Sequence, residues 1–124
     1  MKVFVKYITF IPTLLSYLKG GMLLYEKKYN EALNKLEPCL KHPSFQNELL
    51  YSYYGQTLCG LGRLEEGHNY LIRACIEYEK EGWIFKDDYA QNLAQNTINA
   101  LEHVINHTSI TKGKKYPESV TLMQ

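Results

Sequence analysis

Several features that would assign a function directly are missing from this sequence. Its 124 residues include one tryptophan and three cysteines, and no two cysteines stand in a CxxC spacing. Because the cysteine count is odd, Cys39, Cys59 and Cys75 favour neither a disulfide framework nor a zinc knuckle. The sequence also contains no phosphate-binding loop and no GxGxxG or GxSxG motif. We therefore expect a non-catalytic protein that holds no cofactor and no metal.

The sequence also has no large excess of charge of either sign. The chain has 14 lysines and arginines against 13 aspartates and glutamates, which gives a formal net charge of +1. Nucleic-acid binding normally needs a basic surface, so this balance argues against a nucleic-acid partner. Hydrophobic residues make up 45% of the chain and charged residues 22%, a composition typical of a globular domain.

No apolar run is long enough to span a bilayer, which takes about 20 residues. The longest candidate lies within residues 1–18, where Pro12, Thr13 and Ser16 interrupt it and no cleavage site of small residues follows. We therefore expect a structural first segment in a cytoplasmic protein without a membrane partner. A cleaved secretory signal and a lipid-attached segment remain as alternatives.

Helical periodicity is the main positive signal. Apolar residues recur three or four positions apart in five segments, and no alternating run predicts a pair of strands. The first of these segments begins at Pro12 and has as its apolar positions Leu14, Leu15, Leu18, Met22 and Tyr25. The other four lie at about 29–40, 49–61, 64–78 and 89–107. We predict an all-α fold with a lead-in segment at 1–11, a helical domain at 12–107 and a flexible polar tail at 108–124.

Proline, glycine and capping residues predict where these helices begin and end. Pro12 suits the first turn of a helix, where the missing N–H group has no intrahelical partner. Ser44, after Pro43, can cap the third helix, and Asp87 and Asp88 can cap the fifth. Gly60 and Gly62 predict the end of the third helix. The lead-in segment can be either extended or helical on propensity alone.

The helices form two pairs that resemble each other in sequence. Moving residues 20–40 along the chain by 35 positions aligns identical residues and pairs of small residues. The identical pairs are Gly20 with Gly55, Leu23 with Leu58, Glu31 with Glu66, Asn34 with Asn69 and Leu36 with Leu71, and the small pairs are Ala32 with Gly67 and Cys39 with Ala74. An offset so close to about 34 residues is typical of helical-hairpin repeats.

On these residues the chain resembles the tetratricopeptide repeat family over about residues 12–81. The resemblance implies a short right-handed solenoid of about two repeats, with the fifth helix as a cap or degenerate third copy. Ser16 and Lys19 depart from the family pattern, and an unrelated helical bundle remains an alternative. In this family the first helix of each hairpin lines a concave groove that binds a protein or peptide.

The resemblance places nine partner-binding candidates in that groove: Leu14, Tyr17, Gly21, Leu24, Leu49, Ser52, Gln56, Cys59 and Gln91. This lining is mostly apolar and uncharged, which suits a peptide with apolar anchors. Tyr17 and Gly21 stand where the family's chaperone-tail binders carry a carboxylate clamp, so we do not expect that activity. The expected function is an adaptor or a small chaperone-like binder. The alternative is an immunity or inhibitor protein that blocks one cognate toxin or enzyme.

Three residue pairs have spacings that chemistry can use, and each has a simpler interpretation. His103 and His107 are one helical turn apart, as metal ligands can be, but the run lacks the glutamate of a HExxH site. Neighbouring Asp87 and Asp88 do not face one another on a helix, and capping explains them. Cys39 and His42 have no identifiable orienting acid. We therefore interpret all three pairs as structural.

Overall fold

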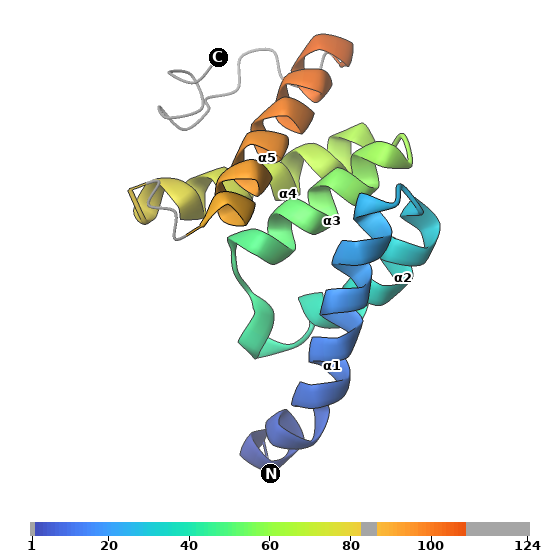
Figure 1. Ribbon diagram of the computed structural model, residues 1–124, viewed down its shortest axis with the longest axis vertical. Coiled ribbons are helices and arrows are strands. Elements are labelled where there is room, and N and C mark those ends of the chain that lie inside the picture. Colours follow the sequence, from blue (N-terminus) through green and yellow to red (C-terminus); the bar gives the residue numbers. More distant parts are fainter. Residues whose placement is uncertain (1, 83–86, 109–124) are drawn as a thin grey trace.

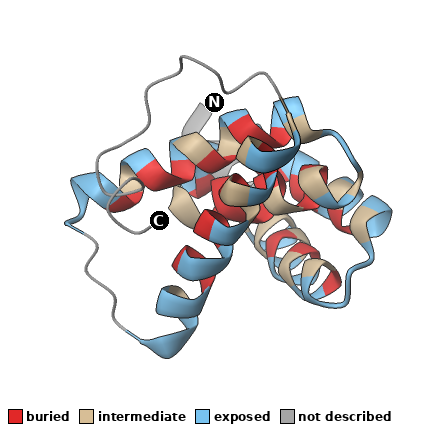
Figure 2. Cartoon of the chain, turned by 90° about the horizontal axis from the view of Figure 1, so that it is seen from above, coloured by how far each residue is buried: buried red, intermediate tan, exposed pale blue. Residues whose placement is uncertain are grey.

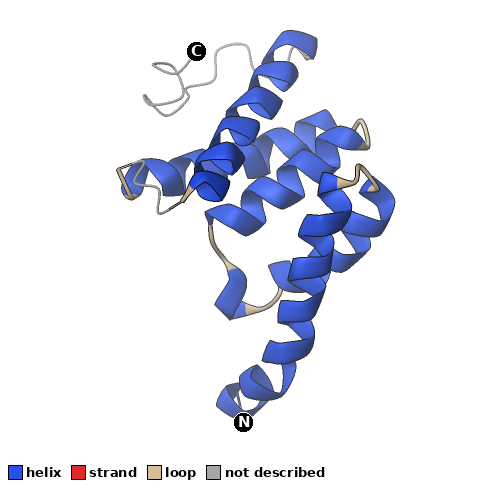
Figure 3. Ribbon diagram, viewed as in Figure 1, coloured by secondary structure: helices blue, strands red, loops and turns tan. Residues whose placement is uncertain are grey.

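The computed structural model describes residues 2–82 and 87–108, with side chains from Phe10 onward, as a bundle of helices (Figures 1 and 3). No strand occurs in these two stretches, so the predicted all-α class is confirmed. The elements are α1 (Lys2–Tyr25), α2 (Tyr29–Leu40), the short 3-10 helix η1 (Pro43–Phe45), α3 (Glu48–Gly60), α4 (Leu64–Lys80) and α5 (Asp88–His107). Beyond Thr108, the predicted flexible tail lies outside the described residues.

The first helix starts ten residues earlier than the sequence predicts, at Lys2 rather than at Pro12. Pro12 therefore lies inside α1, where it leaves one helical hydrogen bond unmade. Packing on the N-terminal side of the proline offsets part of this loss. The ring of Phe10 stacks on that of Phe45, with the centroids 5.5 Å apart. The segment at 2–11 is thus the beginning of α1 and not a separate extended lead-in.

Two helical hairpins and a fifth helix make up the fold. α1 packs along α2, and α3 packs along α4. A short turn connects the two helices of each pair. α3 also contacts α1 and α2, so the first hairpin docks on the second, and α5 crosses α3 and α4 (Figure 1). The N-terminal turns of α1 extend beyond the rest of the bundle (Figure 1).

The buried residues lie on the parts of the helices that face one another, as the colouring of the cartoon shows (Figure 2). α3 is the central element, because it contacts all four other α-helices. Accordingly, burial extends around most of its circumference, from Leu50 to Leu58 with Gln56 the exception. One core cluster joins Leu36, Leu50 and Leu58 between the first hairpin and α3, and another joins Leu71 and Leu101 between α4 and α5. α3 therefore fixes where α1 and α5 lie.

Glycine allows the two helices of each hairpin to approach closely. A Cβ atom added to Gly20 would lie 2.6 Å from the Leu36 side chain. A Cβ atom added to Gly55 would lie 2.8 Å from the Leu71 side chain and 3.1 Å from the Leu71 backbone nitrogen. Both leucines are fully buried. The two contacts involve the residue pairs that the 35-residue alignment matches, so the same packing occurs in both hairpins.

The turns of the two hairpins also share one backbone geometry. The Lys28 N–H donates to the Leu23 carbonyl at 2.9 Å, and the Arg63 N–H donates to the Leu58 carbonyl at 2.9 Å. Each turn has one residue in the left-handed region, Lys27 with φ 62° and Gly62 with φ 81°. Both turns are Schellman motifs, and the residue in the left-handed region of such a motif is commonly glycine. Gly62 adopts the conformation without strain, whereas Lys27 has a Cβ atom that opposes it.

Capping groups set the starts of α3 and α5. The Asp87 carboxylate accepts a hydrogen bond from the Ala90 N–H at 2.8 Å, so Asp87 is confirmed as a cap of the fifth helix, whereas Asp88 is the first residue of α5. At α3 the cap is Asn47, whose side-chain oxygen accepts from the Leu50 N–H at 3.0 Å. The prediction of Ser44 is wrong, because Pro43 begins η1 and Ser44 lies within that turn. The Ser44 N–H instead donates to the His42 ring at 3.1 Å.

The close approach at Gly55 predicts a stability effect. We expect Gly55→Leu to lower the free energy of unfolding by about 1–3 kcal/mol, because the new side chain has to displace Leu71 and part of the α4 backbone. Urea denaturation measures this difference. Asn69→Leu, at an exposed position of α4, is the matched control and should change the value by less than about 0.5 kcal/mol. Equal stability of the two variants would contradict the packing at Gly55.

The left-handed conformation of Lys27 predicts a stabilising substitution. Lys27→Gly removes the Cβ atom and should raise the free energy of unfolding by about 1 kcal/mol. Lys27→Ala removes the charge but keeps the Cβ atom, so it separates the conformational effect from the electrostatic one. Thermal and urea denaturation of both variants should show a gain for glycine only. A gain of the same size for alanine would argue against the strained turn.

Candidate functional site

A cavity of about 1220 Å³ opens between α1, α3 and α5. We call it the α1–α5 groove, because these two helices form its walls and α3 forms its floor. Its lining residues are Tyr17, Leu18, Gly21, Met22, Leu24, Tyr25, Glu26, Lys27, Tyr29, Tyr53, Gln56, Cys59, Gly60, Tyr89, Asn92, Leu93, Gln95, Asn96, Ala100 and His103. The groove exists because α3 holds α1 on one side and α5 on the other.

The α1 wall is apolar and open to solvent. Leu18, Met22 and Tyr25 line it, and their side chains are 53%, 58% and 90% exposed. Large apolar side chains on one face of a helix are normally buried against a neighbour. Here the buried face of α1 is a different one, which includes Tyr17 and Leu23. The helix therefore has a second apolar face that the described chain leaves uncovered.

The α5 wall is polar but carries almost no charge. Asn92, Gln95 and Asn96 line it, followed by His103 further along the helix. The three amides are exposed, and the Gln95 side chain donates to the Asn99 side chain at 3.0 Å. Side-chain amides can both donate and accept hydrogen bonds, so this wall can contact the polar groups of a bound chain without needing an opposite charge.

Aromatic rings form the floor and connect the walls. The Tyr17 ring packs on the rings of Phe45 and Tyr53, with centroid distances of 5.5 Å and 5.6 Å. The Tyr53 hydroxyl is hydrogen-bonded to the hydroxyl of Tyr89 on α5. Burial raises the pKa of both Tyr17 and Tyr53 above the usual range, and the neighbouring Tyr89 hydroxyl adds to the rise. The floor is thus neutral at physiological pH.

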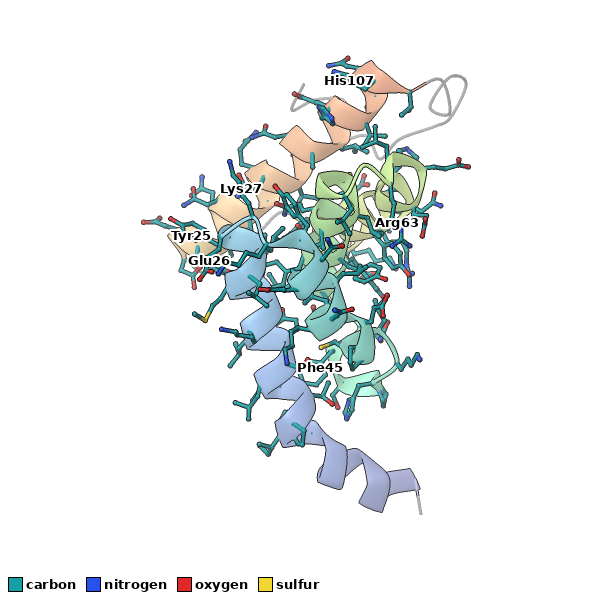
Figure 4. The ribbon with its side chains drawn as sticks, turned by 90° about the vertical axis from the view of Figure 1, so that its right-hand side faces the viewer. Tyr25, Glu26, Lys27, Phe45, Arg63 and His107 are labelled. Atoms are coloured by element: carbon teal, nitrogen blue, oxygen red, sulfur yellow. The ribbon has the colours of Figure 1, made fainter. Side chains whose placement is uncertain are left out.

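Charged residues of the groove lie at the C-terminal end of α1. Figure 4 shows Tyr25, Glu26 and Lys27 together there, on the side of the molecule opposite Arg63. Glu26 forms an exposed ion pair with Lys28, at 3.3 Å between Nζ and the carboxylate oxygen. Lys27 is exposed as well, and so is Lys19, six residues before the last residue of α1. With Lys27 and Lys28 against Glu26, the turn that follows α1 carries one positive charge in excess.

The structure brings five of the nine sequence-predicted site residues to the groove, namely Tyr17, Gly21, Leu24, Gln56 and Cys59. The other four do not line it. Leu14 and Leu49 pack against the core cluster between α1 and α3 instead. Ser52 is fully buried, because its hydroxyl bonds to Thr97 and accepts from the Gln56 amide at 2.9 Å. Gln91 is exposed and is not among the lining residues.

The sequence interpretation missed most of both walls. In the sequence, the spacing of Leu18, Met22 and Tyr25 predicts a helix but does not by itself predict a site. The first helix nevertheless has more apolar positions than one packed face requires. That excess is the signal that could have identified the α1 wall. No comparable signal marks Asn92 and Asn96, because exposed amides are common on any helix. The angle at which α5 crosses α3 decides which of them face the groove.

The described residues offer little for catalysis at this site. Cys59 lines the groove, and burial raises the pKa of its thiol to about 11, so the nucleophilic thiolate is scarce at neutral pH. His103 and His107 stack with centroids 4.1 Å apart, and the His107 ring bonds to the His103 carbonyl at 2.7 Å. Within the described chain no group of three histidine, cysteine, aspartate or glutamate side chains could hold a metal ion.

Comparison of the chain with known protein families, with characterised proteins and with solved structures found no match. Among the helices of the described residues, none combines the length and the apolar character that crossing a bilayer requires. The α1–α5 groove is therefore the feature of the described chain that bears most directly on function.

The raised pKa of the Cys59 thiol predicts that this cysteine reacts slowly with alkylating reagents. Because the pKa of its thiol is raised to about 11, alkylation by iodoacetamide near pH 8 should be at least about tenfold slower than in the unfolded chain. The rate should keep rising with pH beyond about 9, where a free cysteine levels off. Mass spectrometry of labelled peptides, with and without guanidinium, measures both. Equal rates in the folded and unfolded chains would contradict the burial of this thiol.

Proposed function

We propose that this chain is a non-catalytic interaction module that binds a segment of another protein in the α1–α5 groove. The observation that carries the proposal is the pairing of an exposed apolar wall on α1 with an uncharged amide wall on α5. Such a site can bury apolar anchors of a ligand and at the same time contact its polar groups. These are the two requirements for binding a polypeptide segment.

The size of the groove favours a polypeptide over a small metabolite. Pockets for small molecules usually have volumes of about 300–1000 Å³ and enclose most of the ligand. The α1–α5 groove has a volume of about 1220 Å³ and keeps Leu18, Met22 and Tyr25 more than half exposed. An open site of this kind covers one side of a ligand, as peptide-binding grooves do. Burial of each leucine-sized anchor would contribute about 1.5–3 kcal/mol.

We further propose that the two hairpins are copies of one tetratricopeptide-like unit, with α5 as a cap. Three repeated features support this proposal: the Gly20–Leu36 and Gly55–Leu71 contacts, the two turns with Lys27 and Gly62 in the left-handed region, and the docking of α3 on α1 followed by that of α5 on α3. In a stack of such units the first helices share one side of the array, and the α1–α5 groove lies on that side.

Absence of converging reactive groups supports a binding role rather than an enzymatic one. Enzymes place a nucleophile, a base and polarising groups around one point. The described groove residues supply amides, hydroxyls, one exposed histidine and a protonated thiol at neutral pH. The two charged residues of the lining, Glu26 and Lys27, lie together at the end of α1, where the Glu26 carboxylate pairs with Lys28. The tyrosine hydroxyls of the floor ionise only in strongly alkaline solution, because burial raises their pKa values. These groups can bind and orient a ligand.

Site-specific photo-crosslinking in cells tests the proposed function. A photoreactive phenylalanine analogue replaces Met22 on the α1 wall, Asn96 on the α5 wall, or Asn69 on the exposed surface of α4 as the matched control. We expect the two groove positions to yield the same adduct with one protein, and the control not to yield it. Leu18→Asp should abolish this adduct, because a charge on the apolar wall opposes burial of a partner. Adducts formed equally from Asn69 would contradict the groove as the binding site.

A further inference from the structure

The exposed apolar face of α1 extends beyond the groove. Ile11, Leu15, Leu18, Met22 and Tyr25 are 56%, 61%, 53%, 58% and 90% exposed and follow one another at alternating spacings of four and three residues. We call these five residues the α1 seam. Its C-terminal three residues line the α1–α5 groove, and Ile11 and Leu15 continue it toward the N-terminus. In the sequence, the same spacing continues upstream at Phe4 and Ile8.

An alternating spacing of four and three places apolar residues in one stripe along a helix. It averages 3.5 residues, which keeps apolar side chains on one line along a helix that pairs with a second helix. From Ile11 to Tyr25 the seam is about 21 Å long, at 1.5 Å per residue. An extended peptide repeats its side chains every two residues and does not match this spacing. The occupant that fits the seam is a helix with the same apolar repeat.

The charges beside the seam specify the flanks of that helix. Lys19 directly follows Leu18 of the seam, and Lys27 and Lys28 lie at its C-terminal end. All three are exposed, and Glu26 is the one acidic residue among the described side chains of α1 and its turn. Residues that flank the apolar line of paired helices set the choice of partner through charge. Acidic flanks complement this set, and basic flanks oppose it.

A second copy of the chain fits the seam poorly for the same reason. In an antiparallel pair centred on Leu18, Lys19 of each copy would lie close to Lys19 of the other. In a parallel pair, the positions that would face Lys19 are Leu14 and Gly21, which carry no acid. Along this stretch each copy carries three lysines against the single glutamate Glu26, so two copies have the same net charge in any register and a partner of opposite charge is favoured over self-association.

We infer that the α1 seam binds an amphipathic helix of a partner protein, with leucine-like residues in a heptad pattern and acidic residues on its flanks. The C-terminal half of the seam places one end of that helix in the α1–α5 groove, beside the amides of α5. This inference rests on the proposed function and specifies the form and the charge of the bound segment.

Three synthetic peptides of equal length test the inference by fluorescence anisotropy with the full chain. The first has leucines in the heptad pattern and glutamates on the flanks. The second has lysines in place of the glutamates, and the third has the composition of the first with its leucines at every second position. We expect micromolar binding of the first peptide, about tenfold weaker binding of the second at low salt, and at least tenfold weaker binding of the third.

Protein variants show whether binding occurs at the seam. Leu18→Asp should weaken the first peptide at least tenfold, whereas Ile76→Asp, at an exposed apolar position of α4, should leave binding unchanged. Lys19→Glu should weaken the glutamate peptide about threefold and strengthen the lysine peptide. Circular dichroism shows that each variant is folded. Equal binding of the three peptides, or equal effects of Leu18→Asp and Ile76→Asp, would overturn the inference.

Two further outcomes separate this inference from the proposed function. If sedimentation velocity shows a dimer that Leu18→Asp dissociates, the seam is a contact between copies and the inference fails. If crosslinks at Met22 and Asn96 identify a partner while no helical peptide binds, the groove still binds a protein, but the helical form inferred for the bound segment is wrong. Binding of the glutamate peptide with the expected effects at Leu18 and Lys19 supports the inference.

Discussion

The close approach of two helices at a glycine is the constraint on which this fold depends. Gly20 admits the buried side chain of Leu36, and Gly55 admits that of Leu71 together with the α4 backbone. Each hairpin therefore closes tightly and presents its remaining apolar face to the next element. Because α3 belongs to the second hairpin and also contacts α1, α2 and α5, its position determines the spacing of the groove walls. The candidate site therefore results from the way α1 and α5 dock on opposite sides of α3.

The groove combines two walls of different chemistry on a rigid floor. The floor is a set of packed aromatic rings, in which Tyr17 stacks on Phe45 and is tilted against Tyr53, and burial keeps the tyrosines neutral. The Tyr53–Tyr89 hydrogen bond connects α3 to α5. The α1 wall is apolar, the α5 wall carries amides, and the lysines lie near one end. A ligand that buries apolar side chains, offers polar groups to the amides and carries acidic residues matches all three features. This chemistry is that of recognition and needs no reactive group.

Much of the fold could be predicted from the sequence, and less of the site. Period, capping and glycine signals are local, so the helical segments, the Asp87 cap and the break after Gly60 are found where the sequence predicts them. The predicted start of α1 at Pro12 is wrong. Helix propensity is a local property, and it does not include the tertiary contact in which Phe10, two residues before Pro12, stacks on Phe45. Groove residues depend on how helices distant in sequence are oriented. For that reason Tyr17 and Gln56 were found, whereas Asn96 was not.

The origin of the two walls has a consequence for how the site forms. Most contacts of each hairpin join residues close in the sequence, so the two helices of a hairpin can pair early in folding. The groove, however, exists only after α1 has docked on α3, because α1 and α5 come from opposite ends of the array. A ligand that contacts both walls can bind only when the hairpins are docked. Its binding free energy therefore stabilises the docked arrangement of the hairpins. Occupancy of the site and cooperativity of unfolding are therefore thermodynamically linked in this small protein.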